Sequence, residues 1–214
     1  MQTSCHMPPL ETHLNAKLYE RLCAIEPSSK LEYTGNLAYW CEHDKKLPLQ
    51  SKRHPEKEAQ NLASHWIPEI KKAQVITLVG VSHYFIIEAL LQRLPANSHI
   101  IIVEPNLAVL ATFLKENLLP FCQQAGGIHI ISEQEPDHIM LEFRRALSDI
   151  QTFCTGIYTP PTLLRIRPEL KETTKLLSRA LKIDAMDRGT IAAFSDEWLQ
   201  NSILNLPELI QSPG

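Results

Sequence analysis

The central part of the chain alternates short apolar runs with amphipathic segments. Residues 75–79 (VITLV), 99–103 (HIIIV) and 128–132 (IHIIS) are apolar almost throughout. Each run is followed by a longer stretch whose apolar residues recur at helical spacing. Strands that are apolar throughout, rather than alternating, are typical of a parallel sheet covered by helices on both faces. The pattern therefore predicts such a sheet at these positions.

The helices between these strands are expected at about 83–94, 107–117 and 136–150. A fourth apolar run, TFCTGIY at 152–158, is expected to add one more strand. This order of elements predicts a Rossmann-like α/β core.

The segment that precedes the core predicts a small cap. Leucines at three-to-four spacing over 10–25 indicate an amphipathic helix, and a Gly35-Asn36 turn between two stretches rich in Tyr, Leu and Trp indicates a hairpin. Residues 47–50 are expected to form a short strand. Pro55 is favourable in the first turn of a helix that continues to about residue 70.

After the core the pattern is helical again. One helix is expected from Pro168 with an interruption near Gly189, and a second over 194–206. We therefore expect three parts, which are a helix-plus-hairpin cap (1–50), a Rossmann-like α/β domain (51–165) and C-terminal helices (166–214).

Composition excludes several classes of function. The 214 residues carry 21 basic and 24 acidic side chains, so the net charge of −3 offers no positive field and we expect no nucleic-acid partner. The apolar runs are too short to cross a membrane, and the N-terminus lacks the basic start and apolar core of a signal peptide. We expect a cytoplasmic protein with no membrane partner.

The cysteines do not predict a disulfide or metal framework. Five cysteines are scattered along the chain without a C-x-x-C pair, which favours reduced thiols. Cys41 and His43, with His54 further on, are the residues to consider for a metal. Their spacing is less regular than that of known metal ligands, so we expect no metal site.

Gly80 and Glu104 follow the first two strands of the predicted sheet. Ligands of an open parallel sheet bind beyond the carboxyl ends of the strands, where a glycine lets backbone approach the ligand and an acid accepts ribose hydroxyls. Gly80 and Glu104 occupy these two positions, which predicts a nucleotide or S-adenosylmethionine as cofactor.

The expected glycine-rich turn is poorly matched after Gly80. Ser82 is the only other small residue there, and the bulky His83 and Tyr84 stand where the helix should begin. Ser82 is a candidate helix cap. His83 is either a general base or anion contact, or a side chain packed over the strand end. The bulky pair favours a degenerate cofactor site over a working one.

A basic triplet, Lys52, Arg53 and His54, directly precedes the helix that begins at Pro55. Free amides and positive charge coincide at such a place, which predicts an anion site. The alternative is a solvated loop before a capped helix.

Several segments together resemble a known family. LPLQSKRHPEKEA, VITLVGVSHYFIIEALL, IIIVEPN, IYTPPTLLRIRPEL and WLQNSILNLPELIQSPG, within 47–210, are similar in order and spacing to segments of the Maf-type flagellin glycosyltransferases and the related MptE-like 6-hydroxymethylpterin diphosphokinases. The chain departs from them where they carry two or three glycines. The resemblance implies a cofactor crevice formed by Gly80, Ser82, His83, Glu104 and Asn106.

The resemblance also implies a role. Full-length members are expected to transfer a nonulosonic acid from a cytidine-monophosphate donor to flagellin through a central domain, and this chain is expected to end before that domain. We therefore expect an accessory, non-catalytic N-terminal domain, whose partners would be the central catalytic domain, flagellin or a second copy that covers the apolar residues between Trp198 and Leu206. The alternatives are an S-adenosylmethionine-dependent methyltransferase that uses Gly80 and Glu104, and a non-catalytic interaction module.

Overall fold

A computed structural model of the chain describes residues 16–70, 75–95, 98–117, 127–152 and 155–186. The first part of the predicted N-terminal helix, the break near Gly189 and the helix predicted over 194–206 lie outside these residues. Among the described residues, no helix is long and apolar enough to span a membrane.

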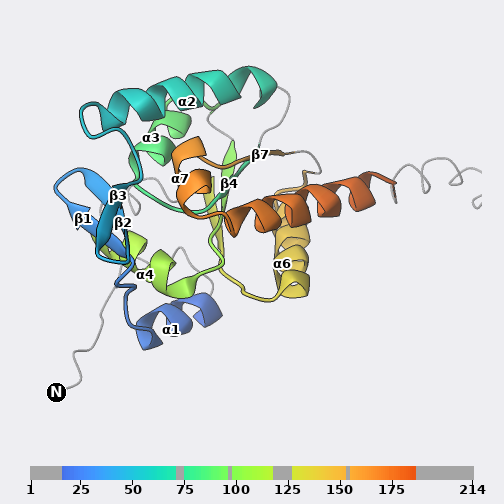
Figure 1. The fold of residues 1–214 in the computed structure, drawn as a ribbon. Coiled ribbons are helices and arrows are strands. Elements are labelled where there is room, and N and C mark those ends of the chain that lie inside the picture. The colour runs from blue at the N-terminus through green and yellow to red at the C-terminus, as the bar shows by residue number, and fades with distance from the viewer. Residues whose placement is uncertain (1–15, 71–74, 96–97, 118–126, 153–154, 187–214) are drawn as a thin grey trace, which may run out of the picture.

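The core is a parallel sheet of four strands (Figure 1). These are β4 (Val75–Val79), β5 (His99–Val103), β6 (Ile128–Ile131) and β7 (Gly156–Tyr158), in the spatial order β6-β5-β4-β7. Every residue of β4 is buried, as expected for a central strand that is apolar on both faces. The prediction of a Rossmann-like α/β core is confirmed.

Helices connect the strands of this sheet. They are α3 (Phe85–Leu91), α4 (Leu107–Glu116) and α6 (Pro136–Asp149). The chain moves from β4 to β5 to β6 and then returns past β4 to β7, so right-handed crossovers place α3 and α4 on one face and α6 on the other. The strand order reverses between β4 and β7, which is where ligands of this architecture bind.

The cap is a three-stranded antiparallel sheet flanked by helices. Its strands are β1 (Leu31–Thr34), β2 (Leu37–Glu42) and β3 (Lys45–Pro48). Helix α1 (Ala16–Ala24) precedes them and packs against α4, and α2 (Pro55–Ile70) follows them and packs against α3. The hairpin and the start of α2 at Pro55 confirm the sequence analysis.

The third strand of the cap begins two residues earlier than predicted. His43 and Asp44 both have positive φ, 47° and 61°, and form a tight turn that returns the chain directly into β3. Such a two-residue turn matches the twist of its flanking strands. The sequence lacks the glycine that normally marks it, and the turn was therefore not predicted.

Two helices, one after the core and one within it, also differ from the prediction. A short helix, α7 (Pro161–Ile166), lies between β7 and the C-terminal helix of residues 170–186, whereas one helix was expected from Pro168. Helix α3 begins at Phe85 rather than His83. Its N-cap is Tyr84, whose side chain makes no capping hydrogen bond, and the Phe85 N–H donates to His83 Nδ1 at 3.4 Å, so the prediction that Ser82 caps this helix is wrong.

Candidate functional site

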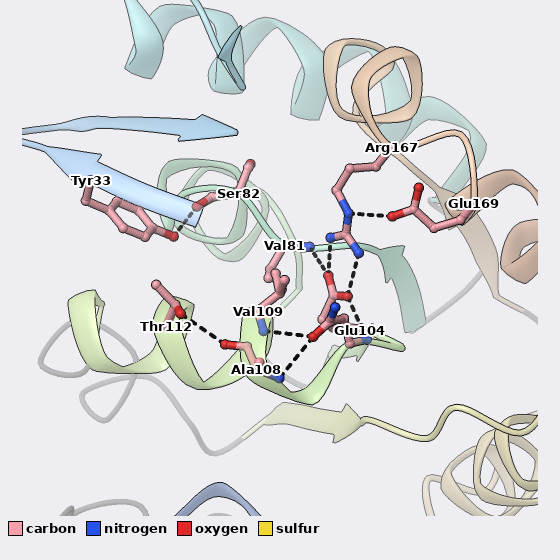
Figure 2. Close-up of polar contacts among 10 residues, drawn as sticks. Tyr33, Val81, Ser82, Glu104, Ala108, Val109, Thr112, Arg167 and Glu169 are labelled. Carbon is pink, nitrogen blue, oxygen red and sulfur yellow. Dashed lines mark hydrogen bonds and ion pairs between the residues drawn. The ribbon is translucent and has the colours of Figure 1, made fainter. Parts of the chain in front are cut away.

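Glu104 is the centre of a polar cluster at the carboxyl end of the sheet. Its side chain is fully buried. The carboxylate accepts hydrogen bonds from the backbone N–H of Val81 (3.1 Å) and of Asn106 (3.0 Å). It also accepts two from the guanidinium of Arg167, at 2.7 and 2.9 Å (Figure 2). The carboxylate is therefore fully paired within the protein.

Arg167 directly follows α7 and is as buried as Glu104. Its side chain is 2% exposed, its Nε donates to Glu169 (2.8 Å), and its guanidinium lies 4.8 Å from the ring centroid of Trp40 on β2. Burial opposes its charge, but hydrogen bonds and attraction to Glu104 outweigh that effect and raise the pKa of Arg167. The cluster thus joins the cap, the sheet and α7.

Gly80 is closely covered by side chains of the same chain. Its φ is +84°, a conformation that favours glycine. A Cβ atom on it would lie 2.5 Å from Leu170 Cδ1 and 2.8 Å from Leu163 Cδ2. Side chains of α7 and the C-terminal helix therefore fill the space where a ligand would approach Gly80.

The cavity that remains beside Gly80 is very small. It measures about 10 Å³ and is lined by Gly80, Ser82, His83 and neighbouring apolar side chains. About 10–15 Å³ is the minimum for one water molecule, whereas ligand pockets usually measure hundreds of Å³. In this conformation the crevice has no room for a nucleotide.

Ser82 and His83 face the cap. The Ser82 carbonyl accepts a hydrogen bond from the Tyr33 hydroxyl on β1 (Figure 2), and His83 stacks on Phe85 with ring centroids 4.1 Å apart. Burial lowers the pKa of His83 to about 4, so its imidazole is neutral at pH 7. This placement agrees with the packed alternative for His83.

Asn106 caps α4. Its side-chain oxygen accepts hydrogen bonds from the backbone N–H of Ala108 (3.1 Å) and Val109 (3.2 Å). The structure therefore brings all five predicted crevice residues to the same end of the sheet. Glu104, Asn106 and the Ser82 carbonyl already bind protein groups there.

The basic triplet lies on the surface before α2. Lys52, Arg53 and His54 are exposed, and the Lys52 ammonium lies 6.0 Å from the ring centroid of Tyr39. The Glu58 carboxylate accepts a hydrogen bond from the Ser51 N–H at the same helix end. An open depression of about 360 Å³ includes His54. Glu58 competes for the positive helix end, and the anion site stays a prediction.

The candidate metal ligands are not gathered. Among the described residues, no group of three His, Cys, Asp or Glu side chains could hold a metal ion. Burial, and next a hydrogen bond from the thiol to Glu32, raise the pKa of Cys41, which disfavours the thiolate that a metal requires.

Sequence reasoning missed Arg167 and Trp40. Arg167 lies in PTLLRIRPEL, where Arg165 two residues earlier is an equal candidate for burial. The available signal was an arginine within an apolar stretch that follows the last strand. A buried acid such as Glu104 needs a cation nearby.

We predict that Glu104 and Arg167 are strongly coupled. Glu104→Gln and Arg167→Met should each lower the free energy of unfolding by about 3–5 kcal/mol, since each leaves a buried group without its partner. The double variant should lose less than the sum of the two, as measured by urea unfolding. Lys46→Met, which breaks the exposed Lys46–Glu32 pair, serves as the control and should change stability little. Additive losses would contradict the coupling.

We predict that His83 makes stability depend on pH between about 6.5 and 4. The unfolded imidazole takes up a proton below its usual pKa of 6.5, but the folded one does so only near 4. The contribution of the buried neutral imidazole to the free energy of unfolding is therefore complete above pH 6.5, and it declines as the pH falls toward 4. His83→Asn should reduce this slope in urea unfolding, and His54→Asn in the exposed loop should not. An unchanged slope in the His83 variant would show that its burial is not maintained.

Comparisons with known proteins add one likeness. A scan against models of protein families finds no match, and a search of curated proteins finds none. Among solved structures, the chain is similar to a Maf glycosyltransferase from Magnetospirillum magneticum AMB-1, with a TM-score of 0.44 and 16% sequence identity. The alignment covers 79% of this chain and 34% of that one, so the likeness is distant and concerns part of that protein.

Proposed function

We propose that this chain is a non-catalytic Rossmann-like domain that serves as the accessory N-terminal domain of a Maf- or MptE-like glycosyltransferase. The observation that carries the proposal is the buried pair of Glu104 and Arg167 at the carboxyl end of the sheet. A cofactor site needs this acid available for ribose hydroxyls. Here both of its oxygens bind a guanidinium of the same chain.

Three features support a closed crevice. Leu163 and Leu170 cover Gly80, the Trp40 ring lies over the Arg167 guanidinium, and the remaining cavity is about 10 Å³. To admit a nucleotide, α7 would have to move and Arg167 would lose its partner in a buried setting. Such a loss costs several kcal/mol, which a ligand would have to offset.

The family part of the proposal is supported by the segments that resemble Maf-type and MptE-like proteins. In a full-length protein of this kind, a central domain would transfer a nonulosonic acid to flagellin, and the present domain would position that domain or its acceptor. Its partners would then be the central catalytic domain, flagellin or a second copy of the chain. The methyltransferase alternative requires an open crevice at Gly80 and Glu104, so ligand binding distinguishes the two functions.

We predict that nucleotides do not stabilise the chain. Calorimetry and thermal unfolding with S-adenosylmethionine and with cytidine and uridine nucleotides should give no shift in Tm. A ligand at one hundred times its Kd would add about 2.7 kcal/mol, which is readily detected. Glu104→Gln is the matched variant. Stabilisation of the wild type that is lost in this variant would establish a working crevice and overturn the proposal.

We also predict that the chain transfers no sugar by itself. Incubated with a cytidine-monophosphate-activated nonulosonic acid and flagellin, the purified chain should leave flagellin unmodified by mass spectrometry, because side chains of the chain itself fill the predicted crevice at Gly80 and Glu104. A full-length protein of the resembled family is the positive control. Transfer that persists through further purification would place catalytic residues within this chain and overturn the accessory role.

A further inference from the structure

One edge of the parallel sheet leaves main-chain groups without strand partners. β6 is an edge strand, and the C=O of Ile131 accepts a hydrogen bond from the Glu104 N–H at 3.0 Å. Along a strand, the backbone N–H and C=O groups of successive residues point alternately to one side and to the other. Ile131 and His129 therefore direct their backbone groups to β5. Ile128 and Ile130 direct theirs outward. Within the described residues, no strand pairs with this edge.

A groove runs along the same edge. It has a volume of about 470 Å³, and every residue from 128 to 133 lines it. Helix α1 forms one wall and α6 the other. The volume is in the range of binding pockets, and the floor includes the four residues of β6, a strand about 13 Å long at roughly 3.3 Å per residue. The shape suits an extended segment of chain.

At the end of the groove next to Ser132 and Glu133, Arg21 already occupies the edge of the strand. Arg21 of α1 donates to the Ser132 carbonyl at 2.9 Å and pairs with Glu133. Ser132 is 2% exposed, and its buried Oγ has no hydrogen-bond partner among the described residues. The groove therefore offers the main-chain groups of Ile128 and Ile130 that have no strand partner among the described residues, and the Ser132 hydroxyl lies buried beneath its surface.

The two walls carry opposite residual charges. Arg21 pairs with Glu133 and Arg145 pairs with Glu142, which leaves Lys17 on α1 and Asp149 on α6. Helix α1 packs against α4, so it lies on the α4 face of the sheet, and α6 lies on the opposite face. Successive side chains of a strand point to opposite faces. A strand in the groove would therefore fit with an acid toward Lys17 and a base toward Asp149.

We propose that this groove binds an extended peptide segment of a partner protein, which adds a strand to β6 with acidic side chains facing Lys17 and basic side chains facing Asp149. Main-chain pairing supplies affinity in strand addition, and the alternating side chains supply specificity. The groove lies along the sheet edge rather than at the crevice, so a failure here leaves the closed-crevice function intact.

A second copy of the chain fits this edge less well. Antiparallel pairing of two β6 edges needs a two-fold axis perpendicular to the sheet, which places α1 of both copies on the same face. The uncompensated Lys17 of one copy would then lie on the same face as Lys17 of the other. Like charges that face each other oppose such a pair. The charge pattern favours a different partner.

The test uses the full chain and a fluorescent peptide built mainly of alternating Val and Thr. One Glu replaces a residue on one face of the extended peptide, and one Lys replaces a residue on the other face. Ile130→Pro removes an outward N–H and leaves the ladder to β5 in place. We expect the peptide to bind the wild type and Ile130→Val, and to bind Ile130→Pro at least about tenfold more weakly. Thermal unfolding checks that each variant is folded.

A second experiment exchanges the charges of the two groove walls and leaves the residues of β6 unchanged. Lys17→Glu combined with Asp149→Lys changes two exposed side chains. This variant should prefer a peptide with Glu and Lys exchanged, whereas the wild type should prefer the original peptide. No binding to the wild type at about 1 mM peptide, or equal binding by both variants to both peptides, would overturn the proposal.

Two further results would assign the groove to another occupant and also overturn the proposal. The first is a concentration-dependent dimer of the wild type that Ile130→Pro abolishes. The second is peptide binding that appears only after residues 1–15 are removed, which would identify the chain's own N-terminal segment as the occupant.

Discussion

The buried charge of Glu104 is the constraint on which the arrangement of this protein depends. A carboxylate that is fully removed from water is tolerated only when hydrogen bonds and an opposite charge compensate for its lost hydration. The sheet supplies two backbone N–H groups, and Arg167 supplies the cation and two further hydrogen bonds. Arg167 can reach this point because α7 follows β7 at the place where the strand order reverses. The position of α7 thus brings the counter-ion of Glu104 to the end of the sheet.

The same pair accounts for the packing of the cap. The Arg167 guanidinium has one face against the Trp40 ring, and such a contact between cation and aromatic ring is strengthened when both are removed from water. Tyr33 on the neighbouring strand donates to the Ser82 carbonyl beside the crevice, and Ser28 bonds to Thr112 of α4 at 2.8 Å. The cap therefore binds where an open Rossmann-like domain would present its ligand site to solvent.

The sequence predicted most of the core and less of the site. Val75–Val79 and His99–Val103 were recognisable because a strand buried on both faces needs apolar residues throughout, and the place of Gly80 and Glu104 follows from the strand ends. The six residues of α7 are too few to show helical periodicity. Pairing between Glu104 and Arg167 joins residues 63 positions apart, and no local pattern encodes it. The close packing at Gly80 is hidden from the sequence for the same reason, since the leucines that lie against it come from distant parts of the chain.

The carboxyl end of the sheet and its β6 edge differ in what they offer to a partner. At the carboxyl end, side chains of the protein itself satisfy the groups that a ligand would use, so chemistry there would first require a buried ion pair to break. At the β6 edge, the groups without a strand partner among the described residues belong to the main chain, and their pairing with another strand breaks no contact of the β5–β6 ladder. The opposite edge is less available, because Trp66 of α2 stacks on Tyr158 of β7 with ring centroids 4.9 Å apart. We therefore propose that a Rossmann-like sheet whose crevice is filled from within can still recognise a partner by the addition of a strand, which requires no cofactor and no movement of α7.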